Sequence, residues 1–202
     1  MKIVKAVVLL SFTIFILLGC DELIKKNVDV PITFTVTQNA TVPAKSDPNK
    51  TSEFVSGGEY DILSHPDVAE VIGTPDKIKK IKITKILYEF KNFTGNVDAT
   101  VSGYFSLPRN TNSSSLFSNL DDDIAAIFTI NPVNVAEAML LREQFTLNGN
   151  FDEVNDYLSQ NAIFQHAFVG SSTHNPAIFN IVLTVSATVT VEASIDFKGN
   201  YN

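Results

Sequence analysis

The C-terminal part of the sequence constrains the fold most, because apolar residues recur there at every second position. From position 179 to position 197, all ten odd-numbered residues are apolar: Phe179, Ile181, Leu183, Val185, Ala187, Val189, Val191, Ala193, Ile195 and Phe197. A period of two is typical of a strand that buries one face. At ~3.3 Å per residue, such a strand would be about 60 Å long. We therefore expect it to bend, or to continue from one sheet into another.

Residues 28–37 show the same pattern near the start of the chain. Apolar side chains occupy the even positions from Val28 to Val36, and Pro31 lies at one of the positions between them. Proline cannot donate a hydrogen bond to a neighbouring strand, so it is confined to edge strands, strand starts and bulges. This pattern predicts a strand at the edge of a sheet.

Residues 79–93 alternate as well, but the phase of the alternation changes. Ile81 and Ile83 share one phase, and Ile86 begins the other. A β-bulge supplies the one extra residue that such a change needs, so we predict a bulge at residues 84–86. A turn at residues 92–96 and a further alternating run to Leu107 predict that these two segments form a hairpin.

Short helices are predicted where a capping residue precedes apolar residues at helical spacing. Ser64, Asn131 and Asn150 are the expected N-caps, with Glu153 completing a capping box after Asn150. Residues 124–130 and 163–169 read as further strands. Together these elements predict a mainly β fold, an antiparallel β-sandwich with two or three short α-helices, in one domain spanning residues 28–202.

The N-terminus has the layout of an export signal. Lys2 and Lys5 precede a mostly apolar stretch at residues 6–18, which is shorter than the ~20 residues that a membrane-spanning helix needs. Directly after it comes the tetrapeptide Leu17-Leu18-Gly19-Cys20, which contains the only cysteine of the chain. An unlipidated cysteine buried in the core is the alternative reading of Cys20.

This tetrapeptide resembles the lipobox of bacterial lipoproteins. The resemblance implies a signal peptide at residues 1–19, cleavage between Gly19 and Cys20, and a diacylglyceryl group on the Cys20 sulfur with an acyl chain on its new amino group. Residues 20–27 would then hold the lipidated cysteine and a polar tether. Two or more acyl chains give stable membrane attachment, whereas one chain does not. No other cofactor is expected.

The body is similar to uncharacterised β-sandwich lipoproteins of Bacteroidota-type bacteria, and faintly to sandwiches of the late-embryogenesis-abundant type. This similarity implies an extracytoplasmic protein of the cell envelope, anchored to the outer membrane in preference to the inner one. An acidic residue such as Asp21 after the cysteine implies inner-membrane retention in enterobacteria, and can favour surface export in Bacteroidota. The sequence therefore leaves both assignments of the membrane leaflet possible.

The charge of the chain argues against nucleic-acid binding. Without Lys2 and Lys5, 13 basic side chains face 22 acidic ones, a formal charge of −9. Such a surface repels phosphate backbones, and no cluster of lysine and arginine is large enough to reverse this repulsion. We expect the partners to be the membrane, through the lipid anchor, and an envelope protein.

Catalytic and metal-binding motifs are weak. His65, His166 and His174 do not have the spacing of metal ligands. Ser171 and Ser172 lie too close to His174 in sequence to provide nucleophile and base together. The acidic run at residues 121–123 lacks the alternate spacing of a calcium loop. We assign no catalytic residue and no metal ligand.

Phe164 and Phe168 give the strand at residues 163–169 a second apolar face, opposite Ile163, Ala167 and Val169. Such a strand either lies in the core, with the helix at residues 151–158 as its cover, or lines a surface for an apolar ligand or partner. We therefore expect a non-catalytic, lipid-anchored interaction domain. The alternative is a carrier or sensor of an apolar small molecule between the sheets, and a hydrolase of envelope polymers has the least support.

Overall fold

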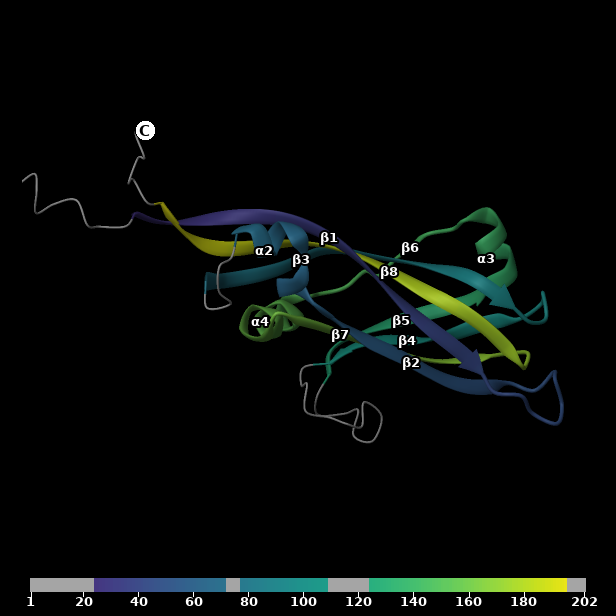
Figure 1. Cartoon of the computed structure of the whole chain (residues 1–202). Helices are drawn as coiled ribbons and strands as arrows, with labels where there is room; N and C mark the ends of the chain where they lie inside the picture. Colours follow the sequence, from purple (N-terminus) through teal and green to yellow (C-terminus); the bar gives the residue numbers. More distant parts are fainter. Residues whose placement is uncertain (1–23, 72–76, 109–123, 196–202) are drawn as a thin grey trace, which may run out of the picture.

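Two antiparallel four-stranded sheets, packed face to face, form the body of the protein (Figure 1). The computed structural model describes residues 24–71, 77–108 and 124–195. The first sheet has the order β1-β8-β3-β6, with β1 at Ile24–Val42, β8 at Ala177–Ile195, β3 at Ile78–Thr94 and β6 at Phe145–Thr146. The second has the order β2-β7-β4-β5, with β2 at Ser52–Asp61, β7 at Ile163–Ser172, β4 at Thr100–Pro108 and β5 at Ile124–Asn134. The predicted β-sandwich is thus confirmed.

The two longest strands, β1 and β8, pair over their whole length, from Ile24 opposite Ile195 to Val42 opposite Ala177. Strand β8 stays in one sheet for all 19 residues and does not cross to the other. Figure 1 shows both strands as a long, twisted ribbon. Strand β1 begins at Ile24, four residues before the predicted start at Val28.

The predicted bulge is present in β3. Its register against β8 shifts between Ile83 and Lys85, and the buried positions change from Ile83 to Ile86 across the shift. The predicted hairpin is wrong, because β3 pairs with β8 and β6, whereas β4 pairs with β5 and β7. The turn after β3 therefore carries the chain from one sheet to the other.

Among the described residues, three short α-helices and one 3₁₀ turn accompany the strands: α2 at Pro66–Val71, α3 at Val135–Leu141, α4 at Asp152–Asn161 and η1 at Ile62–Ser64. The expected start of α3 is wrong. Its N-cap is Asn134, whose side chain accepts a hydrogen bond from the Glu137 amide at 2.9 Å. Asn131 and Pro132 instead belong to β5, where two residues face Ser102 of β4 in a bulge.

The expected caps of the other two helices are also displaced. Ser64 ends the 3₁₀ turn, and α2 begins at Pro66. Asn150 accepts a hydrogen bond from the Asp152 amide at 2.8 Å, one residue before the observed N-cap of α4, which is Phe151.

Aromatic side chains occupy the space between the sheets. Phe105 of β4 contacts Phe168 of β7 and Tyr88 of β3, with ring centroids 4.8 and 5.5 Å apart. Phe54 of β2 joins Phe168 to Phe179 of β8, at 5.5 and 5.4 Å. Each buried ring contributes ~1.5–3 kcal/mol through the hydrophobic effect, so this cluster holds the two sheets together.

Candidate functional site

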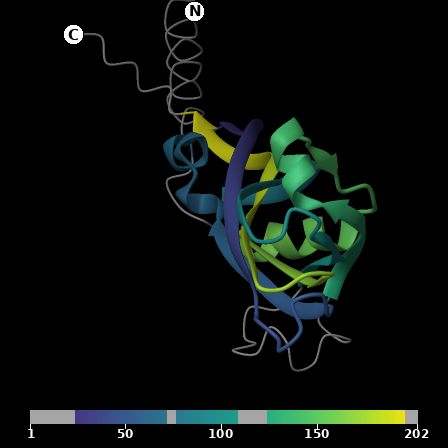
Figure 2. The ribbon, with the colours of Figure 1, turned by 90° about the vertical axis from the view of Figure 1, so that its right-hand side faces the viewer.

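The edges of the two sheets are where this fold could bind another chain, because an edge strand presents unpaired backbone N–H and C=O groups. Strands β1 and β2 are the edges on one side of the sandwich, and β6 and β5 are the edges on the other. Figure 2, turned by 90°, shows β1 and β2 lying away from β5.

Helix α4 closes the first half of the β3 edge, which β6 is too short to cover. The Asn155 side-chain oxygen accepts a hydrogen bond from the Ile83 amide, and the Ser159 hydroxyl oxygen accepts one from the Ile81 amide, both at 2.8 Å. Two helix side chains thus take the place of a neighbouring strand. Asn155 and Ser159 were not predicted to have this role.

Side chains also close the edges on the side of β1 and β2. The Ser56 hydroxyl donates to the Asn39 carbonyl at 2.9 Å, which joins β2 to β1. His65 Nε2 lies 3.3 Å from the Thr33 carbonyl oxygen of β1. The Ser52 hydroxyl donates to the carbonyl of Pro43, directly after β1, at 3.0 Å. Backbone carbonyls of β1 and of Pro43 therefore have side-chain partners, two of which, Ser52 and Ser56, come from β2.

The outer edge of β5 is different. Strand β5 pairs with β4 on one side only, and a groove of about 650 Å³ runs along residues 128–133 on its other side. The facing wall of this groove is formed by residues 144–148, which include β6. Within the described part of the chain, no side chain hydrogen-bonds to the backbone of residues 128–133 as Asn155 does to β3. We call this groove the β5 groove.

The chemistry of the β5 groove suits an uncharged, extended ligand. Its buried lining residues are Tyr88, Phe128, Ile130 and Leu147, and its exposed ones are Thr129, Asn131, Pro132, Gln144, Thr146 and Asn148. Val133 and Phe145 are half-buried, and no lining residue is charged. The floor can therefore take apolar side chains, and the amides and hydroxyls of the rim can hydrogen-bond to a peptide backbone.

Tyr88 fixes one end of the groove floor. Its ring stacks on Phe145 with centroids 5.0 Å apart and planes 21° apart. Burial raises the pKa of Tyr88 to about 12, because the charged phenolate would lose its hydration. The phenol therefore stays protonated and able to donate a hydrogen bond at every physiological pH.

A second, smaller groove of about 400 Å³ lies between β3 and α3. It is lined by Glu89, Phe90, Lys91, Asn92, Met139 and Arg142. Lys91 and Glu89 form an ion pair at 2.7 Å, so two of its three charged groups already satisfy each other. This groove therefore offers a ligand fewer unpaired polar groups than the β5 groove does.

The predicted site residues fall in two places. Gly19 and Cys20 lie outside the described residues. Phe164 and Phe168 are fully buried and point between the sheets, where Phe164 contacts Phe34 at 5.5 Å and Phe168 contacts Phe105. They are core residues. The expected cover is wrong, because α4 packs against β3 and β5, where its side chains close the β3 edge.

The histidines have structural environments. His166 is buried on β7, where its Nδ1 hydrogen-bonds to the side-chain amide of Gln38 on β1. Burial lowers the pKa of His166 to about 4, so the ring is neutral at pH 7. The Ser172 hydroxyl donates to the backbone carbonyl of His174 at 2.8 Å, while the His174 ring lies beside the Thr173 hydroxyl. This serine and this histidine therefore form a turn.

Two further observations concern only residues 24–71, 77–108 and 124–195. None of the helices there has the length and apolar character needed to cross a bilayer. No three His, Cys, Asp or Glu side chains gather there closely enough to hold a metal ion. The acidic run at residues 121–123 lies outside these ranges.

Sequence reasoning missed the β5 groove, although Pro132 carried a signal for it. A proline within an apolar strand marks an edge or a bulge, and Pro132 lies in the β5 bulge that lines the groove. The sequence predicts an N-cap at Asn131 instead, because an asparagine followed by a proline is also typical of an N-cap and a first helical residue.

Comparison with known proteins adds little to this geometry. No protein-family model matches the sequence, and no curated relative is found. The chain has a remote similarity to solved structures of Desmodium yellow mottle tymovirus (TM-score 0.33, 10% identity, 87% of each chain covered) and turnip yellow mosaic virus (TM-score 0.35, 10% identity, 86% of each chain covered). A structure of mud crab tombus-like virus has a TM-score of 0.39 at 6% identity, covering 91% of this chain and 100% of that one.

Proposed function

We propose that this chain is a lipid-anchored, non-catalytic interaction domain of a bacterial cell envelope, which binds an extended segment of a partner protein in the β5 groove. The observation that carries the binding role is the open edge of β5 beside a groove of about 650 Å³. The sequence of the first twenty residues carries the anchoring role.

The anchor follows from the lipobox-like tetrapeptide ending at Cys20. Cleavage before Cys20 and acylation of its sulfur and amino group would attach the protein by two or three chains, which is enough for stable attachment. Strand β1 begins only four positions later, at Ile24. Even a fully extended link of four residues spans at most ~14 Å, so the domain would lie close to the bilayer, on its extracytoplasmic side and at the outer membrane in preference to the inner one.

The binding mode would be strand addition. Along an edge strand, alternate residues direct both N–H and C=O away from the paired strand. A peptide laid along residues 128–133 can pair with those groups of β5, except at the bulge, where Pro132 has no N–H to donate. Its alternate side chains would meet the apolar floor formed by Phe128, Ile130 and Leu147. A segment of about six residues, ~20 Å long, matches this edge.

The carrier alternative has less support. A molecule carried between the sheets would need the space in which Phe54, Phe105, Phe168 and Phe179 pack against one another or against neighbouring rings. The β5 groove lies at the open side of the sandwich, where a chain can enter from solvent. Lipid recovered in stoichiometric amount beyond the anchor would favour the carrier.

The proposal is tested by purifying the lipidated protein from its native envelope and identifying bound proteins and extracted lipids by mass spectrometry. Hydrogen exchange of the purified complex then locates the contact. We expect the amides within residues 128–133 that point away from β4 to become protected only when the partner is bound; Pro132 has no amide proton. Protection elsewhere with none in β5 would contradict the groove assignment.

Matched variants separate the groove from general charge effects. Thr146→Lys with Asn148→Lys places two positive charges on the groove rim, where both side chains are exposed. Thr41→Lys with Asn49→Lys adds the same charge at exposed positions outside the groove lining. We expect the first pair to abolish partner capture and the second to leave it unchanged. Equal capture by both variants would contradict binding at this groove.

A further inference from the structure

A row of lysines lies on the outer face of the β1-β8-β3-β6 sheet. Residues 77–85 contain five lysines and no acidic residue. Lys80, Lys82 and Lys85 are exposed, while Ile81 and Ile83 between them are buried against the other sheet. Across the sheet these lysines pair with Thr190, Thr188 and Ser186 of β8, and those residues pair with Asp29, Pro31 and Thr33 of β1. The three lysines therefore share one solvent-facing surface, which we call the lysine face.

The charges of the lysine face are not neutralised within the described part of the chain. Lys79 pairs with Glu192 at 3.1 Å, whereas Lys80, Lys82 and Lys85 form no ion pair with any described residue. The one acid in the same rows is Asp29, whose carboxylate accepts a hydrogen bond from the Thr190 hydroxyl at 2.6 Å. The rest of this surface is threonine, serine and proline.

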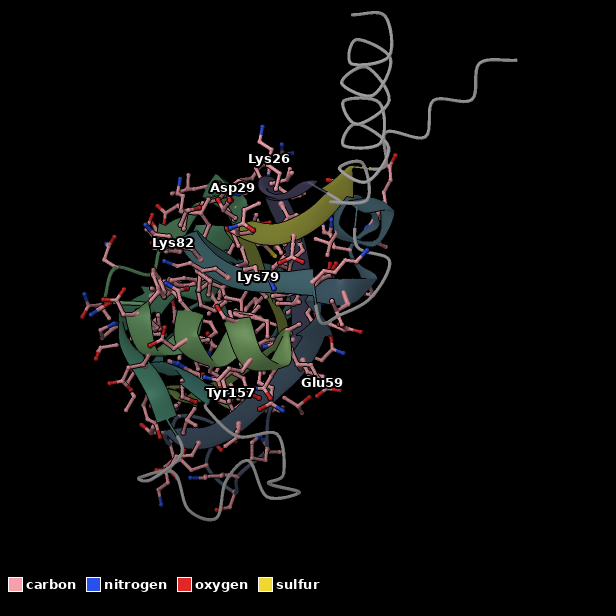
Figure 3. All side chains as sticks on the ribbon, turned by 90° about the vertical axis from the view of Figure 1, so that its left-hand side faces the viewer. Lys26, Asp29, Glu59, Lys79, Lys82 and Tyr157 are labelled. Carbon is pink, nitrogen blue, oxygen red and sulfur yellow. The ribbon has the colours of Figure 1, made fainter. Side chains whose placement is uncertain are left out.

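The lysine face lies at the end of the domain that leads to Cys20. Figure 3 views this end, with Lys26, Lys79 and Lys82 labelled on its upper half and Glu59 below them. Counted along β1, the row of Lys80 is five residues from Ile24 and the row of Lys85 is nine, or ~17 and ~30 Å. A domain standing upright on its anchor would hold Lys85 far beyond the ~10 Å over which charges act in physiological salt.

We propose that the lysine face lies against the anionic headgroups of the bilayer that holds the anchor, so that the domain lies on its β1-β8-β3 face instead of standing upright. This inference rests on the lipid anchor of the proposed function and is independent of the β5 groove. An anionic bilayer complements the lysine face in charge. The chain is acidic overall, so an anionic membrane would repel the rest of its surface.

The contact with the bilayer would be made by the outer face of the β1-β8-β3-β6 sheet and not by the edge of β3. Helix α4 brings Asp152, Glu153 and Asp156 alongside the outer edge of β3, where they would oppose an anionic surface. Each lysine near such a surface strengthens the contact about fivefold. The three together favour the lying orientation over the upright one by about 100-fold.

The test measures orientation on the intact, lipidated protein in vesicles. Because acylation leaves Cys20 without a free thiol, one introduced cysteine can be labelled specifically. Thr35→Cys places a fluorophore on the outer face of the β1-β8-β3-β6 sheet, and Val55→Cys places it on the outer face of the other sheet; both positions are exposed. Energy transfer to a headgroup-labelled lipid reports the distance of each from the bilayer.

In vesicles with about 30% phosphatidylglycerol, we expect strong transfer from the Thr35→Cys label and weak transfer from the Val55→Cys label. The difference should disappear in zwitterionic vesicles and at 0.5 M salt. Neutralising the lysine face by K80Q, K82Q and K85Q should remove it. The control K45Q, K50Q and R142Q removes the same number of positive charges at exposed positions outside the strands of this sheet and should preserve it.

Equal transfer from both labels in anionic vesicles would overturn the inference, as would an equal effect of the two triple variants. Replacing phosphatidylglycerol by phosphatidylserine at the same charge should change nothing, and dependence on one headgroup would refute a general charged surface. A protein that leaves the vesicles at 0.5 M salt would refute the lipid anchor, while an anchored protein with no preferred side would refute this inference alone.

Discussion

The buried histidine of β7 should make the stability of the domain fall in mild acid. His166 is 2% exposed, and its pKa is lowered from 6.5 to about 4 because burial disfavours the charged ring. Between these two pH values, His166 binds a proton in the unfolded chain but not in the folded one. The stabilising contribution of the neutral, buried ring is therefore fully present above pH 6.5 and is lost as the pH falls toward 4.

The size of this effect follows from the two pKa values. A difference of one pKa unit corresponds to about 1.4 kcal/mol, so the shift from 6.5 to about 4 limits the loss to ~3.4 kcal/mol. At pH 4.5, where the folded ring is itself beginning to bind a proton, the loss is ~2.6 kcal/mol relative to pH 7.5. That is a large part of the ~5–15 kcal/mol that stabilises a typical domain.

The measurement is the free energy of unfolding in urea at intervals from pH 7.5 to pH 4.5, for the wild type and for His166→Gln. Glutamine keeps a hydrogen-bonding group beside Gln38 but has no proton to bind in this range. The wild type should lose ~2.6 kcal/mol more than the variant over this range. Parallel pH profiles would refute the assignment, and NMR titration of the His166 ring measures its pKa directly if the variant folds poorly.

Three further predictions concern the closed edge, the core and the anchor. Asn155→Ala removes the acceptor for the Ile83 amide and should lower the free energy of unfolding by ~1–3 kcal/mol in urea titration. Asp156 is exposed on the same helix, so Asp156→Ala should change this free energy by less than ~0.5 kcal/mol. Equal effects of the two variants would contradict the edge-closing role of Asn155. Phe168→Ala should cost ~3–5 kcal/mol in the same assay, since its ring is fully buried, and a neutral effect would instead support the ligand-surface reading. Cys20→Ser should give a protein whose intact mass lacks acyl groups and which leaves the membrane fraction on gentle lysis; a wild-type protein with a maleimide-reactive thiol would refute lipidation.

The features that could be predicted from the sequence are those encoded locally. The alternation in β8 and the phase change in β3 are properties of neighbouring residues, and the structure has both a continuous strand and a bulge between Ile83 and Lys85. The hairpin prediction failed because sheet membership is decided by distant partners. The turn after β3 does not show that β4 will pair with β7.

The groove and the closed edge could not be predicted for the same reason. Residues 128–133 and 144–148 face each other only because β5 and β6 belong to different sheets. Asn155 reaches Ile83 from 72 positions away in sequence, and nothing near Asn155 shows that a strand edge will lie beside it. Polar residues on the buried side of a short helix are the one local signal, because a buried amide needs a hydrogen-bond partner.

The two proposed surfaces are compatible on one molecule. The lysine face belongs to β3, in the row shared with β8 and β1, whereas the β5 groove opens at the side of the sandwich, between the edge of the other sheet and β6. A domain lying on its β1-β8-β3 face would therefore keep the groove open to solvent and hold it at a fixed height above the headgroups. The same variant set tests this relation: if K80Q, K82Q and K85Q release the domain from the bilayer, partner capture should persist while the distance between bound partner and membrane becomes variable.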